Sequence, residues 1–324
     1  MTRLAYILAA SHSGSTLLAM LLNAHPDVCS VGELKATGLG DVERYRCSCG
    51  ELIRRCAFWR RVSEGMARRG IEFDITAAGT HFSAGGSAYT TRLLRPLHRG
   101  RLLEAARDVA LRLSPAWRAA YPKVQRRNAA LAETLCELTG ARVVVDSSKV
   151  GLRLKYLLRN PDLDVRVIRL IRDGRAVALT YTDPASFADA GDPALRGGGM
   201  GGDRAAERLT IAQAAHEWRR SNEEAEHLLA RLDRSRCMGL RYEAVCANSA
   251  VELRPVYAFL GLDPAMAMPG FRSAEHHVLG NGMRLDATSE VRLDERWRTA
   301  LSQADLETFG AVAGELNRRY GYAD

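Results

Sequence analysis

The chain has 324 residues, of which 47% are hydrophobic and 26% charged, and its formal net charge is +8 at neutral pH. This composition is typical of a globular protein, and the absence of solenoid-length repeats and low-complexity tracts excludes repeat proteins and disordered chains. Only four of the 46 basic residues are lysines, so the positive charge is almost all arginine. Arginine suits planar anionic ligands, although a GC-rich genome gives the same bias and accounts for most of the excess in our interpretation.

The N-terminal stretch has a basic start and apolar segments, as a signal peptide does. However, the polar residues 11–15 (SHSGS) interrupt the apolar run at its centre, and no other stretch reaches membrane-spanning length without charges. We therefore expect a cytoplasmic protein with no transmembrane segment.

Short apolar runs and helical spacings alternate along the chain. Residues 3–10 predict a buried strand, and the helix expected over residues 15–25 ends before Pro26. Further strands are expected, in chain order, at residues 28–33, 141–149, 164–172 and 237–245. Further helices are expected at residues 174–181, 211–232 and 250–262, with more helices in the C-terminal tail. Strands that alternate with helices predict an α/β protein with a three-layer, P-loop-like fold and a mostly parallel central sheet of about five strands.

The stretch between the second and third strands is rich in arginine, alanine and leucine at helical spacing. It is interrupted at residues 77–89 and by Pro96, Pro115 and Pro122. We expect a single domain over residues 1–324, with a helical insert at roughly 61–140 and a glycine-rich loop at 191–202. The insert and the loop are the expected acceptor pocket and lid.

Polar residues follow four of the expected strands, at residues 11–16, Glu33, 146–149 and 172–174. Ligands of such sheets bind at the carboxyl ends of the strands, so we expect these segments to share one edge.

The first of these segments (ASHSGSTLL, residues 10–18) has the composition of a phosphate-binding loop. Gly14 allows a tight turn, and the helix that begins near Ser15 directs backbone N–H groups and its positive dipole end at the loop. A cluster that only caps the helix would have the same composition. A Walker A loop would have glycine at Ala9 and lysine at Ser15, and the missing lysine argues against ATP or GTP.

Several stretches resemble the sulfotransferases that use 3′-phosphoadenosine 5′-phosphosulfate (PAPS), in the branch that contains protein-tyrosine sulfotransferases and many bacterial enzymes. Residues 11–33 resemble the opening motif of that family, and residues 167–181 (VIRLIRDGRAVALTY) resemble its second signature. Similarity continues at residues 240–262, in HHVLGNGMR (276–284) with the following Arg296-Trp297, and in the CSCG…C…FW element at 47–59.

The resemblance implies roles for individual residues. The 5′-phosphosulfate would be bound by Ser11, His12, Ser13, Gly14, Ser15 and Thr16. The 3′-phosphate would be bound by Arg172 and Thr180, with Arg284 as a further candidate. The reaction would move a sulfuryl group from PAPS to the hydroxyl of a small molecule, glycan or peptide and needs no metal. No nucleic-acid motif occurs, and the acceptor and the oligomeric state stay open.

Three residues are candidates for catalysis. Glu33 matches the general base of the tyrosine-sulfating branch, and a simple salt bridge is the alternative. His12 stands where relatives carry lysine or arginine: protonated, it would stabilise the leaving phosphate, whereas neutral it would be a weaker donor or would only line the loop. Lys149 lies two residues beyond the lysine position of related enzymes and either reaches the sulfuryl oxygens or is solvated.

Two alternatives to this function remain: a P-loop kinase with an aberrant loop, and a non-catalytic nucleotide-binding protein. Cys47, Cys49 and Cys56 lie close in sequence, but no fourth ligand is evident near them, and C-x-C is not the usual zinc-finger spacing. A metal site, a local disulfide and simple packing stay open for these thiols, and we expect no metal. His276 and His277 are expected to be a surface pair.

Overall fold

The computed structural model describes residues 1–35, 39–83, 87–94, 101–187, 190–196, 208–268, 270–273, 277–286 and 290–323. Five strands of this part form one sheet, in the order β2-β3-β1-β4-β5, and every pairing is parallel. Their bounds are β1 Thr2–Leu8, β2 Val28–Ser30, β3 Val143–Lys149, β4 Leu163–Ile171 and β5 Cys237–Arg241. The predicted fold class, α/β with a mostly parallel sheet of about five strands, is confirmed.

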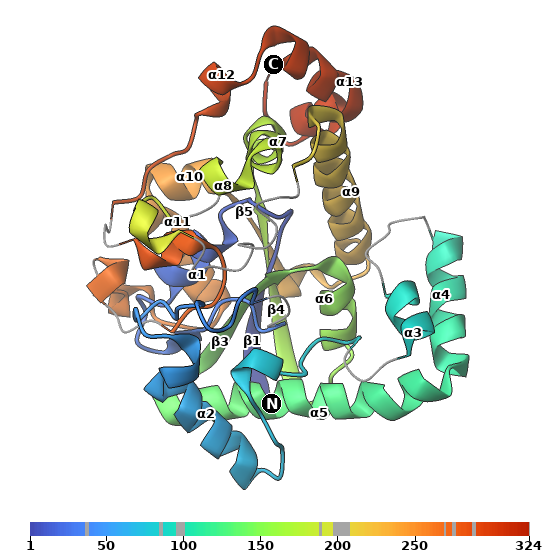
Figure 1. Ribbon diagram of the computed structural model, residues 1–324, viewed down its shortest axis with the longest axis vertical. Coiled ribbons are helices and arrows are strands. Elements are labelled where there is room, and N and C mark those ends of the chain that lie inside the picture. The colour runs from blue at the N-terminus through green and yellow to red at the C-terminus, as the bar shows by residue number, and fades with distance from the viewer. Residues whose placement is uncertain are drawn as a thin grey trace.

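Helices cover both faces of this sheet, as Figure 1 shows. Their bounds are α1 Ser15–Leu22, α2 Ala57–Arg68, α3 Ala88–Leu93, α4 Arg101–Leu113, α5 Pro115–Thr139, α6 Gly151–Leu157, α7 Gly174–Thr182, α8 Pro184–Phe187, α9 Ile211–Leu229, α10 Tyr242–Ala247, α11 Ser249–Phe259, α12 Trp297–Ala300 and α13 Gln303–Arg319. The helix α5 runs across one end of the molecule in Figure 1, beside the N-terminus, and α13 lies at the opposite end.

Strand β1 shows how the layers are built, because its side chains alternate between two apolar cores. Leu4, Tyr6 and Leu8 are buried with residues of α2, α5 and α6. Ala5 and Ile7 are buried with residues of α1, α10 and α11. A third core joins α7, α9 and α13. A strand that is buried on both faces reads as the continuous apolar run from which it was predicted.

The region expected to be a helical insert contains helices α2 to α5. Pro115 occupies the first turn of α5, where its missing N–H costs nothing. The expected interruption at Pro122 is wrong, because α5 continues past it to Thr139. A proline inside a helix costs about 3 kcal/mol. Burial offsets this cost here, since Trp117 packs its ring 5.0 Å from the rings of both Tyr121 and Tyr156.

The strand expected at 237–245 is also only partly correct. The strand ends at Arg241, and residues 242–247 form α10. Tyr242 and Val245 are the buried residues of this segment. Their spacing of three matches the period of a helix and not that of a strand. Helix α6, which directly follows β3, was not among the predicted elements.

Within the part of the chain that the structure describes, no helix combines the length and the apolar character that a membrane span requires.

Candidate active site

The loop between β1 and α1 turns through two left-handed residues, His12 at φ +63° and Gly14 at φ +85°. Gly14 is the N-cap of α1. Because glycine has no side chain, no side-chain hydrogen bond caps the start of this helix. A Cβ atom at Gly14 would lie 2.4 Å from the ring of Tyr242, so only glycine fits. We call residues 9–16 the cradle.

The cradle presents groups that suit an anion. Among the described residues, the buried Ser13 hydroxyl has no hydrogen-bond partner. Ser15 and Thr16 are buried in the first turn of α1. Helix N–H groups without a cap and a hydroxyl without a partner are the donors that phosphate oxygens accept from.

Arg172, directly after β4, binds the cradle from the neighbouring strand. Its Nη1 donates to the backbone carbonyl of His12 at 2.8 Å, and its Nη2 donates to Asp294 Oδ2 at 2.9 Å. Its guanidinium also lies over the ring of Tyr242, 4.5 Å from the centroid. The pKa of Asp294 is held well below its usual range, since hydrogen bonds and charge from Arg296 and Arg172 outweigh its partial burial.

Thr180 lies on α7, which begins after Arg172. Its side chain is buried, and its hydroxyl donates to the Ala176 carbonyl at 3.0 Å. Within the described residues, no hydrogen bond joins Thr180 to Arg172, although the hydroxyl oxygen keeps acceptor capacity.

The carboxylate of Glu33 lies between two lysines. It pairs with Lys149 Nζ at the end of β3 and with Lys35 Nζ at 3.3 Å. Burial favours the protonated acid, but the charges of Lys149 and Lys35 outweigh it and lower the pKa of Glu33 to about 2. Lys149 has φ +69°, an uncommon conformation for a residue with a side chain. Lys35 was not predicted as a site residue, although it stands only two residues after Glu33.

The backbone around Glu33 is held by the buried Asp146 on β3. One oxygen of Asp146 accepts from the Leu34 and Ser148 backbone N–H groups, at 3.2 and 2.9 Å. The other accepts from Arg153 Nε at 3.0 Å, which forms a buried ion pair. The conformation of the Glu33 segment is therefore fixed by β3.

A C-terminal segment, residues 277–285, crosses the same edge of the sheet. Its Leu279 forms a parallel bridge with Gly32, next to Glu33. A Cβ atom on Gly280 would lie 3.1 Å from Thr16 Oγ1 and 3.8 Å from Glu33 Oε1. Gly280 thus connects the cradle with Glu33, and the four polar segments expected at one edge do converge there.

Arg284 is fully buried within this segment. Its guanidinium donates to the carbonyls of Gly280, at 2.7 Å, and Asn281, at 3.0 Å, and also to that of Arg46. It lies over the ring of Tyr45 as well. Arg284 therefore holds the backbone of residues 277–285, whose Gly280 lies beside Thr16 and Glu33.

Arg172 binds the backbone carbonyl of His12, whereas the ring of His12 contacts a different element. It packs edge-on against Tyr181 of α7, with the ring centroids 4.6 Å apart. The side chain is partly exposed. His12 is therefore both a backbone acceptor for Arg172 and a titratable group at the mouth of the cradle.

Residues 5–265 match the model of the sulfotransferase family. The chain belongs to this family. A comparison with curated protein sequences yields no significant match.

Solved structures similar to this sulfotransferase carry related descriptions. One is the sulfotransferase domain of the Synechococcus olefin synthase, with 18% identity over 100% of this chain and 96% of that one, and a TM-score of 0.46. Another is the sulfotransferase domain from the curacin biosynthetic pathway, with 16% identity over 100% and 99%, and a TM-score of 0.48. A sulfotransferase from Mycobacterium tuberculosis has 13% identity over 96% and 77%, and a TM-score of 0.43. At these values the likeness is general, and the assignment rests on the family match.

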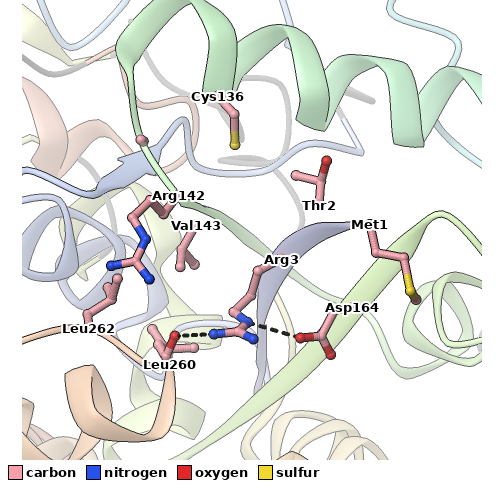
Figure 2. Close-up of a pocket in the computed structure, with 10 residues that line it drawn as sticks. Met1, Thr2, Arg3, Cys136, Arg142, Val143, Asp164, Leu260 and Leu262 are labelled. Carbon is pink, nitrogen blue, oxygen red and sulfur yellow. Dashed lines mark hydrogen bonds and ion pairs between the residues drawn. The ribbon is translucent and has the colours of Figure 1, made fainter.

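The sulfotransferase also has a cavity of about 350 Å³ at the other end of its sheet. It opens at the starts of β1 and β3, where Arg3 bridges Asp164 and the Leu260 carbonyl, as Figure 2 shows. Ligands of parallel sheets bind at the carboxyl ends of the strands, so this cavity is not the candidate active site.

One expectation from the sequence needs correction. Cys47, Cys49 and Cys56 do have a fourth potential ligand nearby, because the fold brings His277 to them from the C-terminal segment. His277 is thus no member of a surface pair. His276 and residues 197–202 of the glycine-rich loop lie outside the residues that the structure describes.

Proposed function

We propose that this protein transfers a sulfuryl group from PAPS to the hydroxyl of an acceptor. The observation that carries the proposal is the cradle itself, which combines a helix start without a side-chain cap, a buried Ser13 hydroxyl without a partner and an arginine bound to the loop. These groups suit a phosphate, and the family match supplies the transferred group.

The donor would occupy the cradle through its 5′-phosphosulfate. Ser11, Ser13, Ser15 and Thr16 would supply hydroxyl groups, while Gly14 and the first turn of α1 would supply backbone N–H groups. Arg172, with Thr180 on α7, would face the 3′-phosphate. Arg172 already pairs with Asp294. The 3′-phosphate would therefore either bind the guanidinium together with the Asp294 carboxylate or displace that carboxylate. Arg284 would act by holding residues 277–285 over the donor.

The reaction is an in-line displacement at sulfur. The acceptor oxygen forms a bond to sulfur, the bond from sulfur to the 5′-phosphate oxygen breaks, and 3′-phosphoadenosine 5′-phosphate leaves with the bonding electron pair. The acceptor proton passes to a base. Charge grows on the leaving oxygen, so donors directed at it stabilise the transition state.

Glu33 is the proposed base, and its ion pairs bear directly on that role. With a pKa of about 2 it is ionised but weakly basic. We propose that Lys149 turns from Glu33 to the sulfuryl oxygens when the donor binds. The pKa of the buried carboxylate would then rise, which makes Glu33 a better proton acceptor at the moment of transfer.

His12 is the proposed donor to the leaving phosphate oxygen. A protonated imidazole at the cradle would stabilise the growing charge and transfer its proton to that oxygen. The acceptor would enter between the helical insert and the glycine-rich loop at 191–202. The start of that loop supports this placement, because Gly191 N–H donates to Asp286 at 2.9 Å. Asp286 directly follows residues 277–285, the C-terminal segment that borders the cradle.

The test is calorimetric titration with 3′-phosphoadenosine 5′-phosphate and, separately, with Mg²⁺-ATP. We expect micromolar binding of the bisphosphate, at least tenfold weaker binding by Arg172→Ala, and no comparable binding of ATP. Arg298→Ala is the matched control, since Arg298 is exposed and pairs with Glu295 on the surface. Preference for ATP would contradict the proposal in favour of a kinase. Binding of the bisphosphate without turnover of PAPS in the presence of any hydroxyl acceptor would indicate a non-catalytic protein.

A further inference from the structure

A short hairpin, residues 45–53, carries two of the clustered cysteines. Cys47 N–H donates to the Glu51 carbonyl, and Gly50 N–H donates to the Cys47 carbonyl, both at 2.9 Å. Gly50 has φ +88°, so it provides the left-handed residue that this tight turn requires. The turn places Cys47 in the interior and Cys49 at the surface.

Two other elements complete the cluster. Cys56 is the residue that precedes α2, so the positive end of the helix dipole faces it and favours a thiolate. His277 comes from the segment above the cradle, more than two hundred residues later in the chain. Its ring stacks on Phe58 of α2, with 4.2 Å between centroids and 4° between planes, and this contact fixes the orientation of the imidazole.

Three of the six distances between the donor atoms match those of a tetrahedral zinc site. His277 Nδ1 lies 3.6 Å from Cys47 Sγ and 3.5 Å from Cys56 Sγ, and Cys49 Sγ lies 3.8 Å from Cys56 Sγ. In a tetrahedron with zinc–sulfur bonds of about 2.3 Å and a zinc–nitrogen bond of about 2.05 Å, the corresponding edges are about 3.6 Å for nitrogen to sulfur and about 3.8 Å for sulfur to sulfur. All four donor atoms lie within 4.8 Å of one another.

The same distances argue against a disulfide in this conformation. A disulfide bond brings two sulfurs to about 2.05 Å. Cys49 Sγ and Cys56 Sγ, at 3.8 Å, are separate thiols.

We propose that Cys47, Cys49, Cys56 and His277 bind one Zn²⁺ ion. Three thiolates and one imidazole in tetrahedral positions select zinc over hard cations, which prefer oxygen ligands. Four protein ligands leave no open position for water or substrate, so the ion is structural. The inference does not depend on the identity of the sulfuryl donor.

The function of the ion follows from what it joins. The hairpin and the C-terminal segment already touch, since Val278 N–H donates to Ser48 Oγ at 2.7 Å and Gly280 N–H donates to the Tyr45 hydroxyl at 3.0 Å. A zinc ion bound by His277, the residue before Val278, would stabilise this contact between the two segments. Because Gly280 lies against Thr16 and Glu33, the ion fixes the segment that borders the candidate active site.

The test is elemental analysis of the full-length protein, purified under reducing conditions without added zinc. We expect one equivalent of zinc, released by an organomercurial that blocks thiols. Cys49→Ser is the first variant, because Cys49 is exposed and its replacement disturbs the core least. It should lose most of the zinc, as should His277→Asn. Cys237→Ser, a half-buried cysteine at the start of β5, should retain it.

A second measurement does not depend on the folding of a variant. The wild-type protein, stripped of metal and titrated with Co²⁺, should show the intense visible absorption of tetrahedral cobalt together with thiolate-to-cobalt charge transfer, saturating at one equivalent. Less than a tenth of an equivalent of zinc together with no cobalt spectrum would overturn the proposal. So would a Cys49–Cys56 disulfide in the purified protein, found by mass spectrometry, or full zinc content in Cys49→Ser. Metal content and the cobalt spectrum are read without an activity assay, so failure here is distinct from failure of the proposed reaction.

Discussion

The guanidinium of Arg172 donates to the backbone carbonyl of His12 at 2.8 Å, which joins the end of β4 to the loop after β1. The same guanidinium is bound by Asp294 and lies over Tyr242, the ring that leaves no room for a Cβ atom at Gly14. One buried side chain therefore sets the shape of the cradle and presents a positive charge beside it.

This relationship predicts that Arg172→Lys behaves almost as badly as Arg172→Ala. A lysine retains the charge but lacks the planar fork that serves His12 and Asp294 together, and a charge-assisted hydrogen bond contributes about 1.5–3 kcal/mol. We expect the affinity for 3′-phosphoadenosine 5′-phosphate to fall at least tenfold, measured by calorimetry. Wild-type affinity in Arg172→Lys would show that a positive charge alone is sufficient for binding. Arg172 would then have no role in positioning the cradle.

The ion pair between Lys149 and Glu33 predicts a change in pH dependence. With both lysines present, the pKa of Glu33 is about 2, so its protonation does not limit kcat/KM near neutral pH. In Lys149→Met, burial of the carboxylate loses its main opposing charge, and the pKa of Glu33 rises. We expect kcat to fall at least tenfold and the acid limb of the kcat/KM profile to move to higher pH. If the acid limb lay at the same pH as in the wild type, Lys149 would not control the pKa of Glu33.

The same pair has a consequence for stability. The pKa of Glu33 in the folded protein lies below its ordinary value of 4.5, so the carboxylate stabilises the fold above that pH. This contribution is lost as the pH falls from about 4.5 towards about 2. Urea denaturation at several pH values should show that Glu33→Gln loses stability less steeply than the wild type over this window. Parallel curves for the two proteins would contradict the shift.

Gly280 predicts a steric effect on the site. An alanine there would place its Cβ 3.1 Å from Thr16 Oγ1 and would hold a strained φ of +142°, which costs about 1–3 kcal/mol. We expect Gly280→Ala to weaken donor binding several-fold, measured by calorimetry. Gly239→Ala is the matched control, since no atom lies within 4 Å of its added Cβ. Equal binding by the two variants would show that residues 277–285 do not border the donor.

His12 can be tested without disturbing the turn. Asparagine adopts the left-handed conformation of His12 more readily than most residues, so His12→Asn keeps the cradle but removes a proton donor. General acid catalysis contributes about 10²–10⁴-fold, and we expect kcat to fall in that range with little change in donor affinity. His216→Asn, at an exposed position on α9, should keep wild-type kcat. If His12→Asn kept it as well, the histidine would only line the loop.

The order of strands and helices could be read from the sequence because it depends on local patterns. Apolar runs predicted all five strands, and the polar residues after them predicted the edge where the candidate site lies. The errors arose where local signals compete with packing. Pro122 does not end α5, because the burial of aromatic rings around this helix offsets the cost of the proline. Tyr242 begins α10 and not a longer strand, because the buried residues Tyr242 and Val245 are spaced as on one face of a helix.

The sequence by itself therefore determined the fold class and the position of the cradle, since both follow from local patterns, and its resemblance to a known family singled out Glu33, Lys149 and Arg172 as candidates. Only the tertiary structure decided what these residues contact. It placed Lys149 on Glu33, Asp294 on Arg172 and His277 beside three cysteines. Such pairs join residues far apart in the chain, and their geometry exists only after the sheet has brought its strand ends together and the C-terminal segment has packed across them.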